Sequence, residues 1–199
     1  MSVNETMNGN EKIALFDMDN TLCDFQGQII EDLNRLRGPD EPEVANLDNL
    51  PEYLEERMSV IKIVPGWWRN LPRLQDGFRL LSAAIEIGFI PHILTKGPVR
   101  TVSAWTEKVE WCRSYIDQLG YTKQPIDITI TQRKGLVYGT VLVDDWPPYI
   151  EQWLKWRRRG LVVMPARDYN AGFRHPQVIR YNDDNFEEVV EQMRKAYLR

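Results

Sequence analysis

Short, uninterrupted runs of apolar residues recur along the chain and predict strands that are buried on both faces. Four runs are pronounced, at residues 13–16, 89–94, 140–143 and 161–164, and a weaker, alternating run spans 126–130. Pro91 cannot donate a backbone hydrogen bond, so we expect the strand that contains it to begin late.

Apolar residues at helical spacing separate these runs. The stripes are Leu74, Phe78, Leu81 and Ile85; then Val102, Trp105, Val109, Cys112, Ile116 and Leu119; then Ile150, Trp153 and Leu154; and finally Phe186, Val189, Val190, Met193 and Tyr197. Gly88 is expected to end the first helix, and Asp184 to cap the start of the last one. Strands that alternate with helices predict an α/β fold, with a parallel sheet covered by helices on both faces.

One stretch, from about residue 24 to residue 71, interrupts the alternation. It is acidic, contains proline and has no comparable strand, but it is helix-like in places, as at Tyr53, Leu54, Arg57, Met58 and Ile61. Connections between a strand and the next helix usually take about two to six residues, so this one is far too long to be a simple loop. We therefore expect a small helical cap at 24–71, a core domain at 11–23 and 72–199, and a flexible tail at 1–10.

Composition narrows the class of protein. With 199 residues, 43% hydrophobic and 27% charged, the chain is typical of one globular domain. The net charge of −4 argues against stable nucleic-acid binding. The sequence contains no apolar run of the roughly 18 residues that a membrane span needs, and no secretory signal at its start, so we expect a cytoplasmic protein. Cys23 and Cys112 suit neither a disulfide framework nor a metal site.

Polar side chains follow the ends of four predicted strands. They are Asp17 and Asp19, then Thr95 and Lys96, then Lys134, then Asp144 and Asp145. Because parallel strands end at the same edge of a sheet, we expect these residues to converge there. Crowded carboxylates require a hard cation, and Mg²⁺ prefers oxygen ligands, whereas no cluster of Cys or His favours zinc.

The hydroxyl group and an ammonium group would bind a phosphate opposite the metal. Lys134 is the preferred cation, and Arg133 is its rival. Asp19, two positions after Asp17, can turn back over the same site, so the two acids can divide the roles of nucleophile and general acid/base.

The segment Phe16–Thr21 resembles the first motif of the haloacid dehalogenase-like (HAD) hydrolase superfamily. Thr95, Lys134 and the pair Asp144–Asp145 lie where the later motifs would be. Within the superfamily, Phe25, the segment Pro65–Pro72 and the Asp144–Asp145 ending are similar to the 5′(3′)-deoxyribonucleotidase family. The cap sequence between Asp24 and Pro65 and the residue after the acidic pair, Trp146, depart from that family.

This resemblance implies a Rossmann-like core and an aspartyl-phosphate mechanism. Asp17 would be the nucleophile and Asp19 the general acid/base, while Thr95, Lys96 and Lys134 would bind phosphate. Asp17, the main-chain carbonyl of Asp19, and Asp145 would hold Mg²⁺. Asp144 would orient Lys134 or a metal-bound water, although the choice between Asp144 and Asp145 as the ligand stays open.

The resemblance also implies a substrate, a small phosphomonoester and in the first place a nucleotide. Phe25 and Trp68 would line its pocket, with packing in the core as the competing interpretation. The alternatives are a sugar phosphate or a nucleic-acid 3′-phosphate. A non-catalytic phosphoacceptor or binding domain is a further alternative, but in response-regulator receivers the acidic pair comes on the first strand, whereas here it comes last. The sequence leaves the oligomeric state open, an oligomer included.

Overall fold

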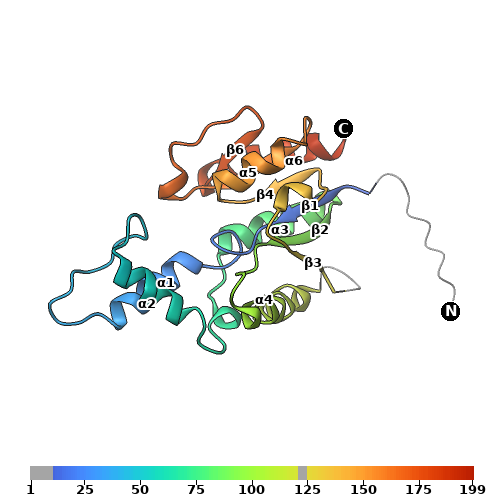
Figure 1. The fold of residues 1–199 in the computed structure, drawn as a ribbon. Coiled ribbons are helices and arrows are strands. Elements are labelled where there is room, and N and C mark those ends of the chain that lie inside the picture. Colours follow the sequence, from blue (N-terminus) through green and yellow to red (C-terminus); the bar gives the residue numbers. More distant parts are fainter. Residues whose placement is uncertain (1–10, 121–124) are drawn as a thin grey trace, which may run out of the picture.

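The computed structural model describes residues 11–120 and 125–199; the predicted flexible tail at 1–10 lies outside these ranges. Its centre is a parallel sheet of six strands in the order β3-β2-β1-β4-β5-β6. The strands are β1 (Ile13–Phe16), β2 (Ile90–Thr95), β3 (Asp127–Ile130), β4 (Val141–Val143), β5 (Leu161–Pro165) and β6 (Val178–Tyr181). The predicted α/β fold with a parallel sheet is confirmed (Figure 1).

Helices cover both faces of the sheet, because successive side chains of each strand point to opposite sides. The helices of the core are α3 (Gln75–Ile87), α4 (Val102–Tyr115), α5 (Pro147–Leu154) and α6 (Phe186–Tyr197). Ala14 and Phe16 of β1 belong to the apolar cluster that includes α3, α4 and α6. Leu15, between them, belongs to the cluster that includes α5.

The strand order reverses beside β1. From β1 the chain adds β2 and then β3 on one side, whereas β4, β5 and β6 follow on the other. Such a switch point leaves a crevice at the carboxyl ends of the two central strands, where open α/β sheets bind ligands. Here the crevice lies beyond Phe16 of β1 and Val143 of β4, which are paired in register.

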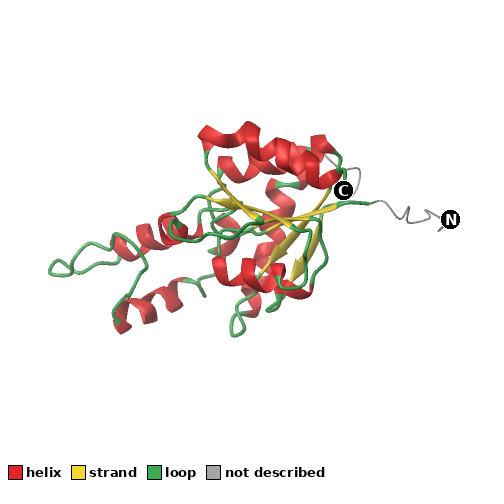
Figure 2. Ribbon diagram, turned by 90° about the horizontal axis from the view of Figure 1, so that it is seen from above, coloured by secondary structure: helices red, strands yellow, loops and turns green. Residues whose placement is uncertain are grey.

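Two helices, α1 (Phe25–Arg35) and α2 (Glu52–Ile61), fall within the segment assigned to the cap. Asp24 caps α1 by accepting a hydrogen bond from the backbone N–H of Gly27 at 2.8 Å. The helices share a small apolar cluster formed by Ile29, Leu33, Val44, Leu54 and Ile61. They extend away from the sheet in both overall views (Figures 1 and 2). Their status as a separate subdomain stays a prediction.

Pro91 lies inside β2, which begins at Ile90, so the expected late start is wrong. Ile90 donates to the Lys12 carbonyl at 2.9 Å, on the side of β1. The next residue faces the other neighbour, β3, which begins only at Asp127, opposite His92. At Pro91 there is therefore no ladder bond to lose, and proline is tolerated.

The predicted apolar stripe of α4 is only partly right, since Cys112 and Ile116 are buried but Trp105 and Val109 are half-buried. Val102 is 78% exposed, and the buried residues of this helix are Ala104, Glu107, Lys108, Trp111 and Cys112. The helix is therefore rotated relative to the prediction, because two charged residues occupy its buried face.

Of the two predictions made for the ends of other helices, one is confirmed and one is wrong. Gly88 ends α3 in the left-handed conformation, as predicted. Asp184 does not cap α6, since that helix follows Asn185 and a short 3-10 turn (Asp183–Asn185) that Asn182 caps. Within the described ranges, no helix is long and apolar enough to cross a lipid bilayer.

Candidate active site

The loop after β1 forms the floor of a cavity of about 940 Å³, which Asp17 and Asp19 both line. Asp17 continues the β1 ladder, since its backbone N–H donates to the Val143 carbonyl at 2.8 Å. Asn20 then adopts a left-handed conformation with φ of 55°, which asparagine tolerates better than most residues. Asp17 and Asp19, two residues apart, both reach the same cavity before the chain turns.

Lys134 lies between two buried carboxylates. Its Nζ is 2.7 Å from Asp17 Oδ1 and 2.8 Å from Asp144 Oδ2, and its side chain is 1% exposed. A 3-10 turn (Lys134–Leu136) presents it to the cavity. Arg133, the rival for its role, is exposed to solvent. Burial lowers the pKa of Lys134, but Asp144 and Asp17 together raise it by more, so the amine stays charged.

Asp145 is buried and lines the cavity. Thr21 Oγ1 donates to its Oδ1 at 3.1 Å, and the Tyr169 hydroxyl donates to its Oδ2 through a short hydrogen bond. Asp144 has other partners, Lys134 and the backbone N–H of Trp146 at 2.9 Å. Oxygen atoms of Asp17, Asp144 and Asp145 lie within 4.8 Å of one another. These three acids could hold one metal ion between them.

Burial gives the three acids high pKa values. Desolvation is the largest cause in each case and raises the pKa of Asp17 to about 7, and those of Asp144 and Asp145 to about 6. Asp144 also raises the pKa of Asp17, while Lys134 lowers it. Three carboxylates with one ammonium group leave a negative excess that a divalent cation would offset.

Asp19 contacts a lysine that the sequence analysis did not single out. Lys108 Nζ, on α4, is 2.5 Å from Asp19 Oδ2 and donates to Thr95 Oγ1 at 3.0 Å. Thr95 and Lys108 are fully buried, whereas the Asp19 side chain is 26% exposed. The acid/base candidate and the predicted phosphate-binding hydroxyl thus share one buried ammonium group.

Aromatic rings form one wall of the cavity. Phe25 and Trp68 both line it, and their rings stack with centroids 5.5 Å apart and planes at 23°. Lys96 lines the same cavity, with its Nζ 5.6 Å from the centroid of the Tyr149 ring. The structure therefore brings the predicted site residues to one place, although Thr95 and Asp144 are covered by their neighbours rather than open to the cavity.

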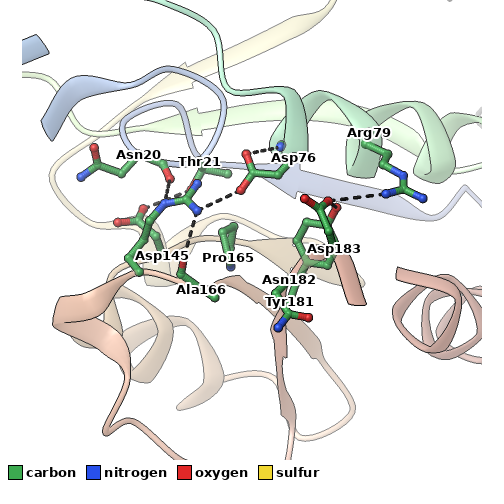
Figure 3. Close-up of polar contacts among 12 residues, drawn as sticks. Asn20, Thr21, Asp76, Arg79, Asp145, Pro165, Ala166, Tyr181, Asn182 and Asp183 are labelled. Carbon is green, nitrogen blue, oxygen red and sulfur yellow. Dashed lines mark hydrogen bonds and ion pairs between the residues drawn. The ribbon is translucent and has the colours of Figure 1, made fainter. Parts of the chain in front are cut away.

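A second network, of hydrogen bonds and an ion pair, anchors the loop after β1 in the region shown in Figure 3. Arg167, after β5, donates through Nε to the Asn20 carbonyl at 3.0 Å and through a terminal nitrogen to Asp76 Oδ2 at 2.9 Å. Asp76 also accepts from the Gly77 N–H at 2.8 Å, at the start of α3. The strained turn at Asn20 is thus tied to both α3 and the end of β5.

Three residues that contact the predicted site residues were not predicted from the sequence: Thr21, Lys108 and Tyr169. Thr21 lies within the first motif but had no role there. Lys108 could have been found from Ala104, Trp111 and Cys112, whose spacing places residues 107 and 108 on the same helical face. Tyr169 follows β5, another strand that ends at this edge of the sheet.

Solved structures with a similar fold are hydrolases of the haloacid dehalogenase type and a related enzyme. A putative haloacid dehalogenase-like hydrolase from Burkholderia xenovorans aligns at 17% identity with a TM-score of 0.53, covering 92% of this chain and 98% of that one. A HAD hydrolase of family IA, variant 3, from Entamoeba histolytica aligns at 13% identity with a TM-score of 0.54, covering 94% and 100%. A putative beta-phosphoglucomutase from Thermotoga maritima aligns at 15% identity with a TM-score of 0.54, covering 91% and 99%.

Comparison with curated proteins gave no match. A family model gave one: residues 11–195 match the family described as 5′ nucleotidase, deoxy (Pyrimidine), cytosolic type C protein. That range contains the whole sheet and every side chain of the site. With its HAD-type fold and its aspartates at the switch point, the chain belongs to this family of deoxynucleotidases within the haloacid dehalogenase-like superfamily.

Proposed function

We propose that this protein is a Mg²⁺-dependent phosphomonoester hydrolase, a 5′(3′)-deoxyribonucleotidase that acts through an aspartyl-phosphate intermediate. The observation that carries the proposal is the position of Asp17. It is buried at the switch point and lines the cavity, with Lys134 at 2.7 Å and with oxygen atoms of Asp144 and Asp145 within 4.8 Å. Membership of the family supports the nucleotide as substrate.

In the first step, a carboxylate oxygen of Asp17 attacks phosphorus, and the bond from phosphorus to the ester oxygen breaks. Asp19 gives its proton to that departing oxygen. In the second step, water attacks the aspartyl phosphate and passes a proton to Asp19, and the acyl–phosphate bond breaks to release orthophosphate. Lys134, charged and fixed by two carboxylates, offsets negative charge on the transferring group.

The donor set suits Mg²⁺. Asp17 and Asp145 offer buried carboxylate oxygens to the cavity, and the burial that raises their pKa values disfavours them as unpaired anions. Asp17, Asp145 and the main-chain carbonyl of Asp19 would hold the ion, with Asp144 orienting Lys134. When bound, the ion would supply positive charge next to the phosphate.

The aromatic wall supports a nucleoside as the leaving group. Phe25 and Trp68 present stacked rings beside the cavity, and a planar base can pack against such a surface. Lys96 lines the cavity and would bind phosphate oxygens; Thr95 would do so only once the neighbours that cover it move aside. The helical segment at 24–71 would act as a cap that keeps bulk water from the intermediate. The family description, which contains the word cytosolic, supports a cytoplasmic location.

A panel of substrates tests this proposal. Phosphate release would be measured with dUMP, dTMP, a hexose phosphate and a 3′-phosphorylated oligonucleotide, with Mg²⁺ and with EDTA. We expect the deoxynucleotides to be the best substrates and EDTA to stop the reaction reversibly. Preference for the sugar phosphate would refute the nucleotidase assignment while leaving the chemistry intact.

The nucleophile is tested separately with Asp17→Asn. We expect this variant to stay folded, because Lys134 keeps Asp144 as a partner, and to lose activity by a factor of at least about 10³, because no covalent intermediate can form. Near-normal turnover by purified Asp17→Asn would refute the mechanism.

A further inference from the structure

Lys108 is a fully buried lysine that the four motifs of the active site do not include. A buried ammonium group is costly unless it is paired and hydrogen-bonded. Lys108 Nζ is 2.5 Å from Asp19 Oδ2 and donates to Thr95 Oγ1 at 3.0 Å. It also lies over the Trp68 ring, 4.6 Å from the centroid. These partners are the candidate acid/base, the hydroxyl predicted to bind phosphate, and an aromatic wall of the cavity.

The contacts fix one oxygen of Asp19. The Asp19 side chain is part-exposed and lies beyond the end of β1, where its backbone makes an isolated bridge to Cys23. Its other oxygen, Oδ1, has the Cys23 thiol at 3.9 Å, which is a weak donor. The ammonium group of Lys108 is therefore the strong contact that orients this carboxylate.

The helix that carries Lys108 also holds the end of the capping segment. Glu107, the preceding residue, accepts hydrogen bonds from the backbone N–H groups of Gly66 at 2.8 Å and Trp68 at 3.1 Å. The Trp68 indole in turn donates to the Lys62 carbonyl, at the end of α2, at 2.9 Å. Residues 107 and 108 thus join the aromatic wall and the acid/base to one rigid helix.

We propose that Lys108 is a positioning residue that holds Asp19 in the orientation for proton transfer and couples that orientation to the Trp68 wall. The inference rests on the proposed function, because it assigns Lys108 a part in both proton transfers of that reaction. Lys108 acts through Asp19 and does not itself touch the reacting atoms.

If Lys108 has this role, its loss should slow formation of the aspartyl phosphate only when the leaving group needs a proton. It should slow hydrolysis of the aspartyl phosphate with every substrate. A nucleoside alkoxide needs a proton from Asp19 in order to leave, whereas p-nitrophenolate leaves without one. Hydrolysis of the aspartyl phosphate requires Asp19 as a base in both cases. With p-nitrophenyl phosphate, a variant with a misplaced Asp19 should therefore form the intermediate normally and hydrolyse it slowly.

The test uses Lys108→Met in the full chain with Mg²⁺, followed by stopped-flow detection of nitrophenolate. We expect kcat for dUMP to fall by at least about 10², the usual contribution of general acid–base catalysis, with little change in KM. With p-nitrophenyl phosphate we expect a burst of one equivalent per enzyme, and a ratio of burst rate to steady-state rate at least about tenfold above wild type. Lys195→Met, an exposed lysine on α6, is the matched control and should behave as wild type.

Two more variants keep the test decisive. Lys108→Arg keeps the charge but has a longer, planar head, so we expect a smaller loss of kcat with the same burst. This variant decides the question if Lys108→Met does not fold. In an Asp19→Asn background, Lys108→Met should cause no additional loss, because residues that act as a unit are non-additive.

Specific outcomes overturn the inference. They are wild-type kinetics in both Lys108 variants, equal slowing of both steps without a larger burst ratio, or full additivity with Asp19→Asn. Failure of the proposed function looks different, since the wild-type enzyme itself would then release no nitrophenolate or carry no phosphate on Asp17.

Discussion

Charge balance around Lys134 shows how single residues define this site. Asp17 and Asp144 share its ammonium group at 2.7 and 2.8 Å, and all three side chains are almost completely buried. Removing one member of a buried ion pair leaves an uncompensated charge, which typically costs about 3–5 kcal/mol. Lys134 is therefore important for stability as well as for its proposed role in binding phosphate.

Substituting Lys134 and Arg133 in turn tests which of these two neighbouring cations has the predicted role. We expect Lys134→Met to lower kcat by at least about 10², because a fixed charge next to the transferring group is lost, and to lower the melting temperature. Arg133→Met should retain both values, since the Arg133 side chain is exposed and its hydrogen bond to Thr131 Oγ1 is made by the backbone N–H. The measurements are phosphate release and thermal denaturation. Equal loss in both variants would mean that the role assigned to Lys134 is wrong.

Individual residues also show how much of the candidate site could be predicted from the sequence. Asp17, Lys134 and Asp145 were predicted because each follows the end of an apolar run, and parallel strands end at one edge. Lys108 was not predicted, because it comes from the middle of a helix, and a charged residue there is normally exposed. The spacing of the buried residues of α4 places Lys108 on the buried face, but its contact with Asp19, 89 residues away, cannot be read from that spacing.

At the level of elements, the first turn of α3 packs directly against the loop after β1. A Cβ atom on Gly77 would collide with the Thr21 carbonyl, a backbone atom that cannot easily move. Thr21 itself donates to Asp145. We therefore expect Gly77→Ala to displace the loop, to destabilise the fold by about 1–3 kcal/mol and to reduce activity strongly.

Gly172→Ala is the matched control, because nothing lies within 4 Å of the added Cβ atom. The readouts are thermal denaturation and kcat for each glycine variant. Normal activity in Gly77→Ala would show that the loop does not need this close packing.

Glu107 connects two elements, α4 and the 3-10 turn (Trp68–Asn70) that ends the capping segment. Glu107 is 8% exposed. Removing a buried acceptor leaves its two N–H donors without a partner, which costs about 1–3 kcal/mol of folding stability. We expect Glu107→Ala to raise KM more than it lowers kcat, because the Trp68 wall loosens. Hydrogen exchange at residues 66 to 68 should increase. Glu110→Ala, which removes an exposed ion pair with Arg69, is the control.

The elements differed in how well their patterns predicted them. Strands β1, β4 and β5 are buried on both faces, so continuous apolar runs identified them. Strand β6 was not predicted, because it is a short edge strand whose first three residues are only partly buried and include Arg180. Helix α1 lies in a stretch predicted only as part of the cap, and its buried residues, Ile29 and Leu33, pack on α2 rather than on the sheet.

At the scale of the whole molecule, the fold concentrates negative charge where β1 and β4 end. Burial raises the pKa of Asp17 to about 7, and the pKa values of Asp144 and Asp145 to about 6, above the ordinary value of 3.8. Below pH 4 the folded and unfolded states both bind these protons, and stability is unaffected. As pH rises from 4 to 7, the unfolded chain ionises first, so these acids progressively destabilise the metal-free protein; above pH 7 the penalty is constant.

Magnesium should reverse this penalty, because it binds the ionised carboxylates of the folded state. A ligand at 100 times its Kd stabilises a protein by about 2.7 kcal/mol, which is roughly 5–10 °C for a chain of this size. We expect Mg²⁺ to raise the melting temperature by about that amount at pH 8, and by much less at pH 5, where protons compete. Asp145→Asn should lose the effect, whereas Asp183→Asn, at an exposed acid that does not line the cavity, should keep it. A shift of equal size at both pH values would mean that the buried acids are not the ligands, because only ionisation of these acids makes binding depend on pH in this range.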